Sequence, residues 1–399
     1  MKRLFYLCLF MLGGLTAGAQ TVRVAAPLKS EDYIIRNGNL DNAWYCIRKD
    51  KQATVAFLGG SITHMEGWRD MVCKYLSDTY RGTNFNFIAA GIPSLGSLPH
   101  AFRFQRDVLD KGKVDLLFIE SAVNDHVNGT DETTQRRALE GIVRHMLSAN
   151  PDANIVLMAF VDPDKMADYK AGKIPAEVQV HADIARKYHL PFINLAREIT
   201  DRINAREFTW QDDFKDLHPS PFGQGLYFNT IRQLLDGAFK RPVPAKLIAA
   251  QLPMPADSFN YQYASYADIH EATNKNGFQL VESWQPDDNT ATRPGFVHVP
   301  VLVSDSSGGS LEFTFTGRAV GIGVLSGPDA GTIQYSIDGQ PMKEKDVYTE
   351  WSKDLYLPWY LLLGDGLTQE KHILRLQTGG PHTGSTKNIC RIVYFLVNK

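Results

Sequence analysis

The fold is indicated most directly by one short stretch, which reads Val55-Ala56-Phe57-Leu58-Gly59-Gly60-Ser61-Ile62-Thr63. Its unbroken apolar run predicts a strand that is buried on both faces, as strands inside parallel sheets are. The two glycines then allow a sharp turn and a close approach by substrate. Ser61 would therefore lie at the carboxyl end of a strand, where α/β proteins form their active sites. We interpret it as a candidate nucleophile, although an ordinary Gly-Gly-Ser loop would also fit these residues alone.

Strand-like and helix-like segments alternate on the carboxyl side of Ser61. The predicted strands are 85–89, 114–120, 154–160 and 191–194, and the predicted helices are 67–80, 133–150, 176–188 and 223–239. Alternation at this short spacing implies right-handed βαβ units, and therefore a parallel sheet with helices on both faces. Pro163 and Pro175 are assigned to a loop. Residues 20–52 are expected only to edge the sheet.

The character of the chain changes after the last predicted helix. Pro-rich runs at 241–244 and 252–255 indicate a linker, which we place at 246–256, after a first domain of residues 20–245. From 257 to 399 the segments are short, β-rich and divided by turns, a pattern that predicts an antiparallel β-sandwich. The predicted strands are 295–303, 310–316, 319–325, 332–337, 356–363, 372–377 and 389–397.

Composition and the first residues indicate where the protein acts. The 399 residues carry a formal net charge of −2, which gives no reason to expect nucleic acid or an anionic membrane as partner. Residues 1–19 begin with Lys2-Arg3, continue as an apolar run and end in Ala17-Gly18-Ala19, the form of a secretory signal peptide. We expect cleavage after Ala19 and an exported protein, periplasmic or extracellular. No stretch is long enough to predict a membrane span.

The cysteines and the known cofactor motifs give little chemistry. Cys46, Cys73 and Cys390 remain after signal-peptide removal, so at most one disulfide can form, and burial as small apolar side chains is the simpler interpretation. Their spacing matches no zinc or redox site, and the chain has no P-loop, dinucleotide fingerprint or H-E-x-x-H motif. We therefore expect neither a metal nor a cofactor.

Four predicted loop sites carry residues suited to acyl transfer, namely Ser61, Gly91, Asn124 and His218. His218 would take the hydroxyl proton of Ser61 and later pass it to the leaving alkoxide. The backbone N–H groups of Ser61 and Gly91 and the side-chain amide of Asn124 could form an oxyanion hole. Other histidines are interpreted as non-catalytic, His64 and His126 beside the site and His145 and His181 on helix surfaces.

At these positions the chain resembles the SGNH or GDSL-like hydrolases, a family of esterases and lipases, over about residues 53–240. The resemblance implies a flavodoxin-like three-layer α/β/α fold. It is carried by Gly59-Gly60-Ser61-Ile62-Thr63, Ala90-Gly91-Ile92-Pro93-Ser94-Leu95-Gly96-Ser97, Ala122-Val123-Asn124-Asp125 and Asp216-Leu217-His218-Pro219. The absence of a glycine two residues after the serine argues against the G-x-S-x-G elbow of ordinary α/β-hydrolases.

Two departures from the family pattern concern the acid of the catalytic triad. The family usually has Asp before the serine, where this chain has Gly60, and an acid three residues before the histidine, where it has Lys215. Asp216 is the nearest substitute and is our predicted triad acid, with Asp213 in reserve. A dyad of the serine and histidine alone stays open.

The branch of the family with Gly-Gly-Ser-Ile-Thr and a C-terminal sandwich is similar to bacterial carbohydrate esterases. The resemblance implies removal of acetyl or other small acyl groups from an acylated polysaccharide or oligosaccharide. Aromatic residues of the jelly-roll-like sandwich could stack on sugar, although core packing is the stronger interpretation for most of them: Trp351, Tyr356, Trp359 and Tyr360. Two alternatives stay open, a glycan-binding protein with a decayed hydrolase domain and a lipase or lysophospholipase.

Overall fold

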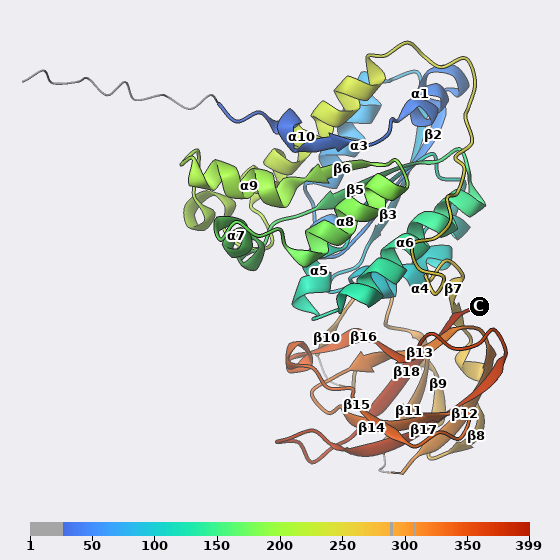
Figure 1. The fold of residues 1–399 in the computed structure, drawn as a ribbon. Coiled ribbons are helices and arrows are strands. Elements are labelled where there is room, and N and C mark those ends of the chain that lie inside the picture. The colour runs from blue at the N-terminus through green and yellow to red at the C-terminus, as the bar shows by residue number, and fades with distance from the viewer. Residues whose placement is uncertain (1–26, 288–289, 306–307) are drawn as a thin grey trace, which may run out of the picture.

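The computed structural model describes residues 27–287, 290–305 and 308–399, which form an α/β domain followed by a β-sandwich (Figure 1). The predicted signal peptide, residues 1–19, lies outside these described residues. Within them, no helix has both the length and the apolar character that crossing a membrane requires.

A six-stranded sheet with the order β1-β6-β5-β4-β2-β3 forms the centre of the first domain. Its strands are β1 (Ile34–Arg36), β2 (Gln52–Gly59), β3 (Asn84–Gly91), β4 (Leu116–Glu120), β5 (Asn154–Ala159) and β6 (Pro191–Asn194). All neighbours pair in parallel except β1, which joins β6 antiparallel at the edge. The five parallel strands, numbered along the chain, have the flavodoxin-like order 2-1-3-4-5, which confirms the predicted fold.

Helices cover both faces of this sheet, so that β2 and β4 are buried as the apolar runs predict (Figure 1). One face carries α1 (Asp41–Tyr45), α3 (Trp68–Thr79) and α10 (Pro221–Phe239), and the face toward the second domain carries α4 (Ser97–Asp107), α6 (Glu132–Ala149) and α8 (Ala176–Lys187). The remaining helices are α2 (Ser61–His64), α5 (Ala122–Val127), α7 (Pro163–Lys170) and α9 (Leu195–Asn204). Shorter or irregular turns are η1 (Ser30–Tyr33), η2 (Cys46–Asp50), η3 (Leu109–Lys111) and η4 (Trp210–Phe214).

The loop predicted around Pro163 is wrong, because that residue begins helix α7. Asp162 precedes it, and its carboxylate accepts a hydrogen bond from the backbone N–H of Lys165 at 2.8 Å. Proline suits the first helical position, since the N–H that it lacks would have no partner within the helix. Asp162-Pro163 is therefore a helix start rather than an interruption.

The second domain is a sandwich of two mainly antiparallel sheets. One has the order β10-β16-β13-β18-β11-β9 with β7 beside β18, and the other has the order β15-β14-β17-β12-β8. The strands are β7 (Ala264–Ala267), β8 (Thr273–Asn276), β9 (Gln279–Trp284), β10 (Ala291–Thr292), β11 (Val299–Ser304), β12 (Ser310–Thr316), β13 (Ala319–Ser326), β14 (Gly331–Ile337), β15 (Lys343–Asp346), β16 (Leu355–Gly364), β17 (Lys371–Pro381) and β18 (Cys390–Asn398), with turns η5 (Ile269–Glu271) and η6 (Glu350–Ser352). From β12 to β14 and from β16 to β18, successive strands alternate between the sheets, as a jelly-roll-like sandwich requires.

The two domains share a packed interface, which lies on the sandwich sheet that contains β7 and β18. Helix α4 packs on β7 and β18. The Arg106 guanidinium on α4 lies over the rings of Tyr266 and Tyr394 and donates a hydrogen bond to the Tyr394 hydroxyl. Inside the sandwich, Phe313 and Phe395 stack with their ring centroids 3.9 Å apart. The sandwich therefore has its own core and also covers one side of the α/β domain.

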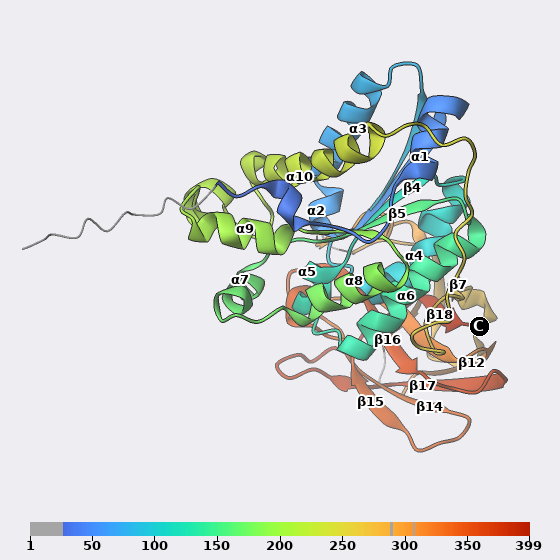
Figure 2. The same cartoon turned by 45° about the horizontal axis from the view of Figure 1, so that its top comes forward.

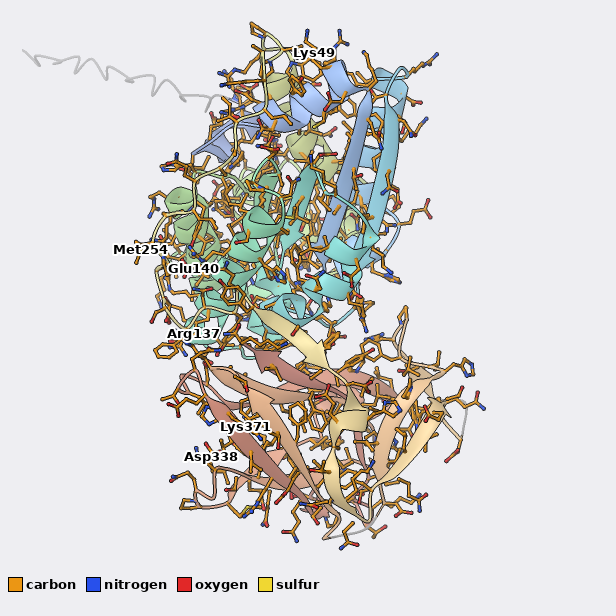
Figure 3. The ribbon with its side chains drawn as sticks, turned by 90° about the vertical axis from the view of Figure 1, so that its right-hand side faces the viewer. Lys49, Arg137, Glu140, Met254, Asp338 and Lys371 are labelled. Carbon is orange, nitrogen blue, oxygen red and sulfur yellow. The ribbon has the colours of Figure 1, made fainter. Side chains whose placement is uncertain are left out.

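The segment 240–263 connects α10 to β7 and follows the surface of the first domain. The carboxylate of Glu140, on α6, is 1% exposed and accepts the backbone N–H groups of Ala256 at 2.6 Å and Asp257 at 3.0 Å. Figure 3 shows Glu140 on the side of the domain along which this segment runs. The residues predicted as a linker, 246–256, thus lie within a connection that is fixed to the first domain at its end.

The three cysteines are unpaired in the described chain, as their interpretation as apolar side chains suggests. Cys46 and Cys390 are buried and Cys73 is half-buried. Burial raises the pKa of each thiol to about 12, so all three are neutral at physiological pH.

Candidate active site

Ser61 and His218 meet at the carboxyl end of the parallel sheet. Ser61 follows β2 and begins the single turn α2, which Figure 2 shows at the same end of the sheet as α5. His218 comes from the loop between η4 and α10, and its Nε2 lies 2.9 Å from the Ser61 hydroxyl oxygen. The histidine side chain is 52% exposed, so this hydrogen-bonded pair is open to an incoming substrate. The pair has the geometry of a nucleophile with its general base.

The two candidate acids differ in what they contact. Asp216 Oδ1 lies 3.8 Å from His218 Nδ1 and accepts the backbone N–H of His218 at 2.5 Å. The chain turns tightly here, because Lys215 has a left-handed φ of +84°. Asp213 instead accepts hydrogen bonds from the backbone N–H and the hydroxyl of Thr209, at 2.8 and 3.2 Å. Asp216 therefore faces the imidazole, beyond direct hydrogen-bond distance, while Asp213 stabilises its own loop.

Asn124 lies beside the nucleophile, and Gly60 is what allows it to be there. The asparagine is in the first turn of α5, directly after β4, and is 9% exposed. A Cβ atom on Gly60 would lie 2.0 Å from Asn124 Oδ1. Within the described chain, the Asn124 side chain has no intramolecular hydrogen bond, so its amide is available to a ligand. The first departure from the family pattern thus has a steric cause: with Asn124 in this position, there is no space for an aspartate before Ser61.

We expect Gly60→Ala to lower kcat toward 4-nitrophenyl acetate by about 100-fold. The added methyl group has to displace Asn124, and losing one oxyanion donor typically costs about that much. The matched control is Gly82→Ala, because no atom lies within 4 Å of a Cβ at that position. An unchanged kcat for Gly60→Ala, in a protein of wild-type thermal stability, would contradict the role of Asn124.

Gly91 ends β3 and lies against the turn that carries Ser61. A Cβ on Gly91 would lie 2.6 Å from the backbone nitrogen of His64 and 2.8 Å from its Cα. The glycine therefore lets α2 approach the sheet. His64 donates its Nδ1–H to the Gly91 carbonyl at 3.1 Å, a structural role like the one expected for it. The proximity of Gly91 to α2 is compatible with its predicted place in the oxyanion hole.

A buried arginine that sequence reasoning missed holds the strand ends below the site. Arg103, on α4, is 0% exposed and donates to the carbonyl oxygens of Ala90 at 2.5 Å and Gly59 at 3.3 Å. It also forms an ion pair with Asp107 at 2.9 Å. The guanidinium thus joins the carboxyl ends of β2 and β3. The available signal was a charged residue in the run Phe102-Arg103-Phe104, because a charge among buried apolar residues requires partners.

Asp125, next to Asn124, anchors the loop that follows β3. Its Oδ1 accepts the backbone N–H of Ser97 at 2.7 Å and the Ser97 hydroxyl at 2.9 Å. Burial raises the pKa of Asp125 to about 7. The group therefore takes up a proton more readily than an exposed carboxyl does, and it becomes mainly uncharged only below neutral pH.

The remaining histidines are structural, and one expectation about them is wrong. His181 is 0% exposed rather than on the surface, because α8 packs this side of the helix into the domain, and burial lowers its pKa to about 4. His126 lies between Asp164 at 2.9 Å and Glu177 at 3.2 Å. Desolvation lowers the pKa of His126, but the hydrogen bond that its ring donates to Asp164, together with nearby carboxylates, raises the pKa overall. Neither ring contacts Ser61 or His218.

The second domain contacts the loop that follows β3, although its aromatic residues mostly serve packing. Tyr356 and Tyr360 are 6% and 7% exposed, whereas Trp351 is 50% exposed. A cleft of about 290 Å³ lies between the domains and is lined by Ser94, Leu98, Asn128 and Asp131 from the first and by Lys345, Pro358 and Trp359 from the second.

Across residues 27–287, 290–305 and 308–399, no three histidine, cysteine or carboxylate side chains form a group that could hold a metal ion.

Comparisons with known proteins agree with this architecture. Residues 57–226 match the model of the GDSL-like Lipase/Acylhydrolase family. Among solved structures, the chain is similar to a two-domain esterase (CEX) active on acetylated mannans, in two crystal structures, one of them with mannopentaose. The complex is 20% identical, with a TM-score of 0.77 over 94% of this chain and 99% of that chain, and the other structure is 20% identical, with 0.76 over 93% and 98%. At this identity the likeness shows the fold, and it extends over both domains. No curated protein sequence matches the chain.

Proposed function

We propose that the protein is an exported serine esterase that removes acetyl or other small acyl groups from polysaccharides, a proposal supported by the match of residues 57–226 to the GDSL-like lipase/acylhydrolase family. The observation that carries the proposal is the 2.9 Å hydrogen bond between His218 Nε2 and Ser61 Oγ, with the free amide of Asn124 beside it. Export rests on the signal-peptide pattern of residues 1–19.

In the proposed reaction, Ser61 Oγ attacks the acyl carbon while His218 Nε2 accepts its proton. The carbonyl electron pair moves onto oxygen, where the Asn124 amide and the backbone N–H groups of Ser61 and Gly91 would stabilise the negative charge. Collapse of this intermediate breaks the bond to the sugar oxygen, which takes the proton from His218. A water molecule, activated by the same histidine, then hydrolyses the acyl-enzyme and restores Ser61.

A carbohydrate substrate is favoured over a lipid by two observations. The structurally similar esterase acts on acetylated mannans and shares both domains with this chain. The cleft between the domains is lined by Ser94, in the loop after β3, by the ring of Trp359 and by polar residues such as Asn128 and Asp131. A flat ring next to hydrogen-bonding groups suits a sugar better than an acyl chain.

We expect the purified protein to release acetate from acetylated mannan, and its kcat/KM on 4-nitrophenyl esters to fall from acetate through butyrate to octanoate. We expect a short acyl group to be preferred because the nucleophile lies at the carboxyl end of the parallel sheet, and the recognised part of the substrate is proposed to be the sugar rather than the acyl chain. Mannan deacetylated with alkali is the matched control for acetate release. A preference for octanoate would indicate a lipase, and binding to mannan without hydrolysis of any ester would indicate a decayed hydrolase.

A further inference from the structure

The loop between β3 and α4, residues 91–97, lies beside Gly60 at the candidate site and is anchored at both ends in the first domain. At its start the backbone N–H of Ile92 donates to the Gly59 carbonyl at 3.0 Å, and at its end Ser97 donates to Asp125. The Leu95 carbonyl in its middle lies 3.4 Å from the position of a Cβ on Gly60. The conformation of this loop therefore affects the place where the oxyanion would form.

The middle of the loop contains a conformation that needs support. Ser94 has a φ of +72°, a left-handed conformation that non-glycine residues seldom adopt unless surrounding contacts fix it. Asn128, just after α5, donates its side-chain amide to the Ser94 carbonyl at 2.9 Å. The Ser94 hydroxyl points the other way, toward the second domain.

The second domain supplies the contact with that hydroxyl. The guanidinium of Arg293, between β10 and β11, donates from Nη2 to the Ser94 hydroxyl oxygen at 3.0 Å. Beside it, Ile92 packs against a small apolar cluster of the sandwich, which is distinct from the main core between its sheets and comprises Trp284, Phe296, Val301, Leu325, Tyr356 and Val393. One polar and one apolar contact from the second domain thus meet the same loop.

We infer that the second domain supports catalysis through a positioning residue, because Arg293 holds Ser94, and with it the loop 91–97, in the conformation needed to stabilise the oxyanion. The inference rests on the proposed esterase function. It assigns the sandwich a role that does not depend on glycan binding. An acyl ester too small to reach the second domain still depends on Arg293.

The test compares Arg293→Met, Ser94→Ala and the double variant with the wild type, using 4-nitrophenyl acetate. Methionine keeps much of the side-chain volume but cannot donate to Ser94. We expect kcat to fall by about 10- to 100-fold in Arg293→Met, as when catalytic groups are displaced by a fraction of an ångström to one ångström, with KM nearly unchanged. Because both single changes break the same hydrogen bond, the double variant should lose little more than either one.

The matched control is Arg375→Met, which removes an exposed arginine of the second domain that pairs with Glu312. Wild-type kcat in a folded Arg293→Met protein, or additive losses in the double variant, would overturn the inference and leave the esterase function standing. A loss confined to KM for acetylated mannan would also overturn it, since Arg293 would then be a substrate contact. A wild-type protein that hydrolyses no ester would overturn both proposals.

Discussion

The Ser61→Ala variant is expected to lose hydrolysis of 4-nitrophenyl acetate and of acetylated mannan, with kcat reduced by about 10⁴-fold or more. Alanine removes the hydroxyl oxygen that lies 2.9 Å from His218 Nε2 and would attack the acyl carbon. The fold should be unaffected, because the Ser61 hydroxyl is half-buried and its hydrogen bond is to an exposed histidine. Release of acetate, measured by coupled assay, and the thermal unfolding temperature give the two readings.

The control for this variant is Ser77→Ala, which removes an exposed serine hydroxyl from α3. It should retain wild-type kcat. Turnover by Ser61→Ala within tenfold of the wild type would exclude Ser61 as nucleophile and with it the acyl-enzyme mechanism.

The second large effect concerns the acid that serves His218. We expect Asp216→Asn to lower kcat by about 10²- to 10⁴-fold with little change in KM. The upper value applies to buried triads, and here the carboxylate is 68% exposed and 3.8 Å from Nδ1, so that solvent weakens its effect on the imidazolium. The asparagine also keeps an acceptor for the His218 backbone N–H, which separates the loss of charge from any collapse of the loop.

Asp213→Asn is the matched variant, five residues before the histidine instead of two. It should reduce kcat only slightly, because its carboxylate accepts from Thr209, and an asparagine oxygen can accept the same hydrogen bonds. The opposite ranking would transfer the role to Asp213. Two small effects would mean that Ser61 and His218 act as a dyad.

The sequence predicted the strands of the central parallel sheet and the long helices because each of these segments carries its own apolar pattern, whereas the flavodoxin-like arrangement followed from the family resemblance. Helix α4 was missed, because Pro99 in its first turn and the buried Arg103 interrupt the apolar pattern that would have revealed it. Short edge strands such as β8 and β15 were missed for a related reason, since all their residues are exposed and no alternation marks them.

For the site, the sequence located Ser61 and His218 but not the contacts that arrange them. The contact between Gly60 and Asn124 joins two strand ends that are distant in sequence, and only the packed sheet brings them together. Arg293 is 199 positions from Ser94 and lies in the other domain. Such pairs follow from the tertiary arrangement, which no local pattern contains.

The connection between the domains affects how strong their contacts need to be. Glu140 fixes the segment 240–263 to the first domain near Ala256. Arg137 then pairs with Asp257, and its backbone carbonyl accepts the N–H of Tyr261, so the segment stays bound to the first domain almost to β7 at Ala264. The sandwich is therefore held near the loop 91–97 at a high effective concentration, as a short tether holds a second binding module close to its site. Under this condition the hydrogen bond from Arg293 and the packing of Ile92 can stay formed although they bury little surface. Docking of the sandwich on that loop therefore depends little on the affinity that the two domains would have as separate molecules.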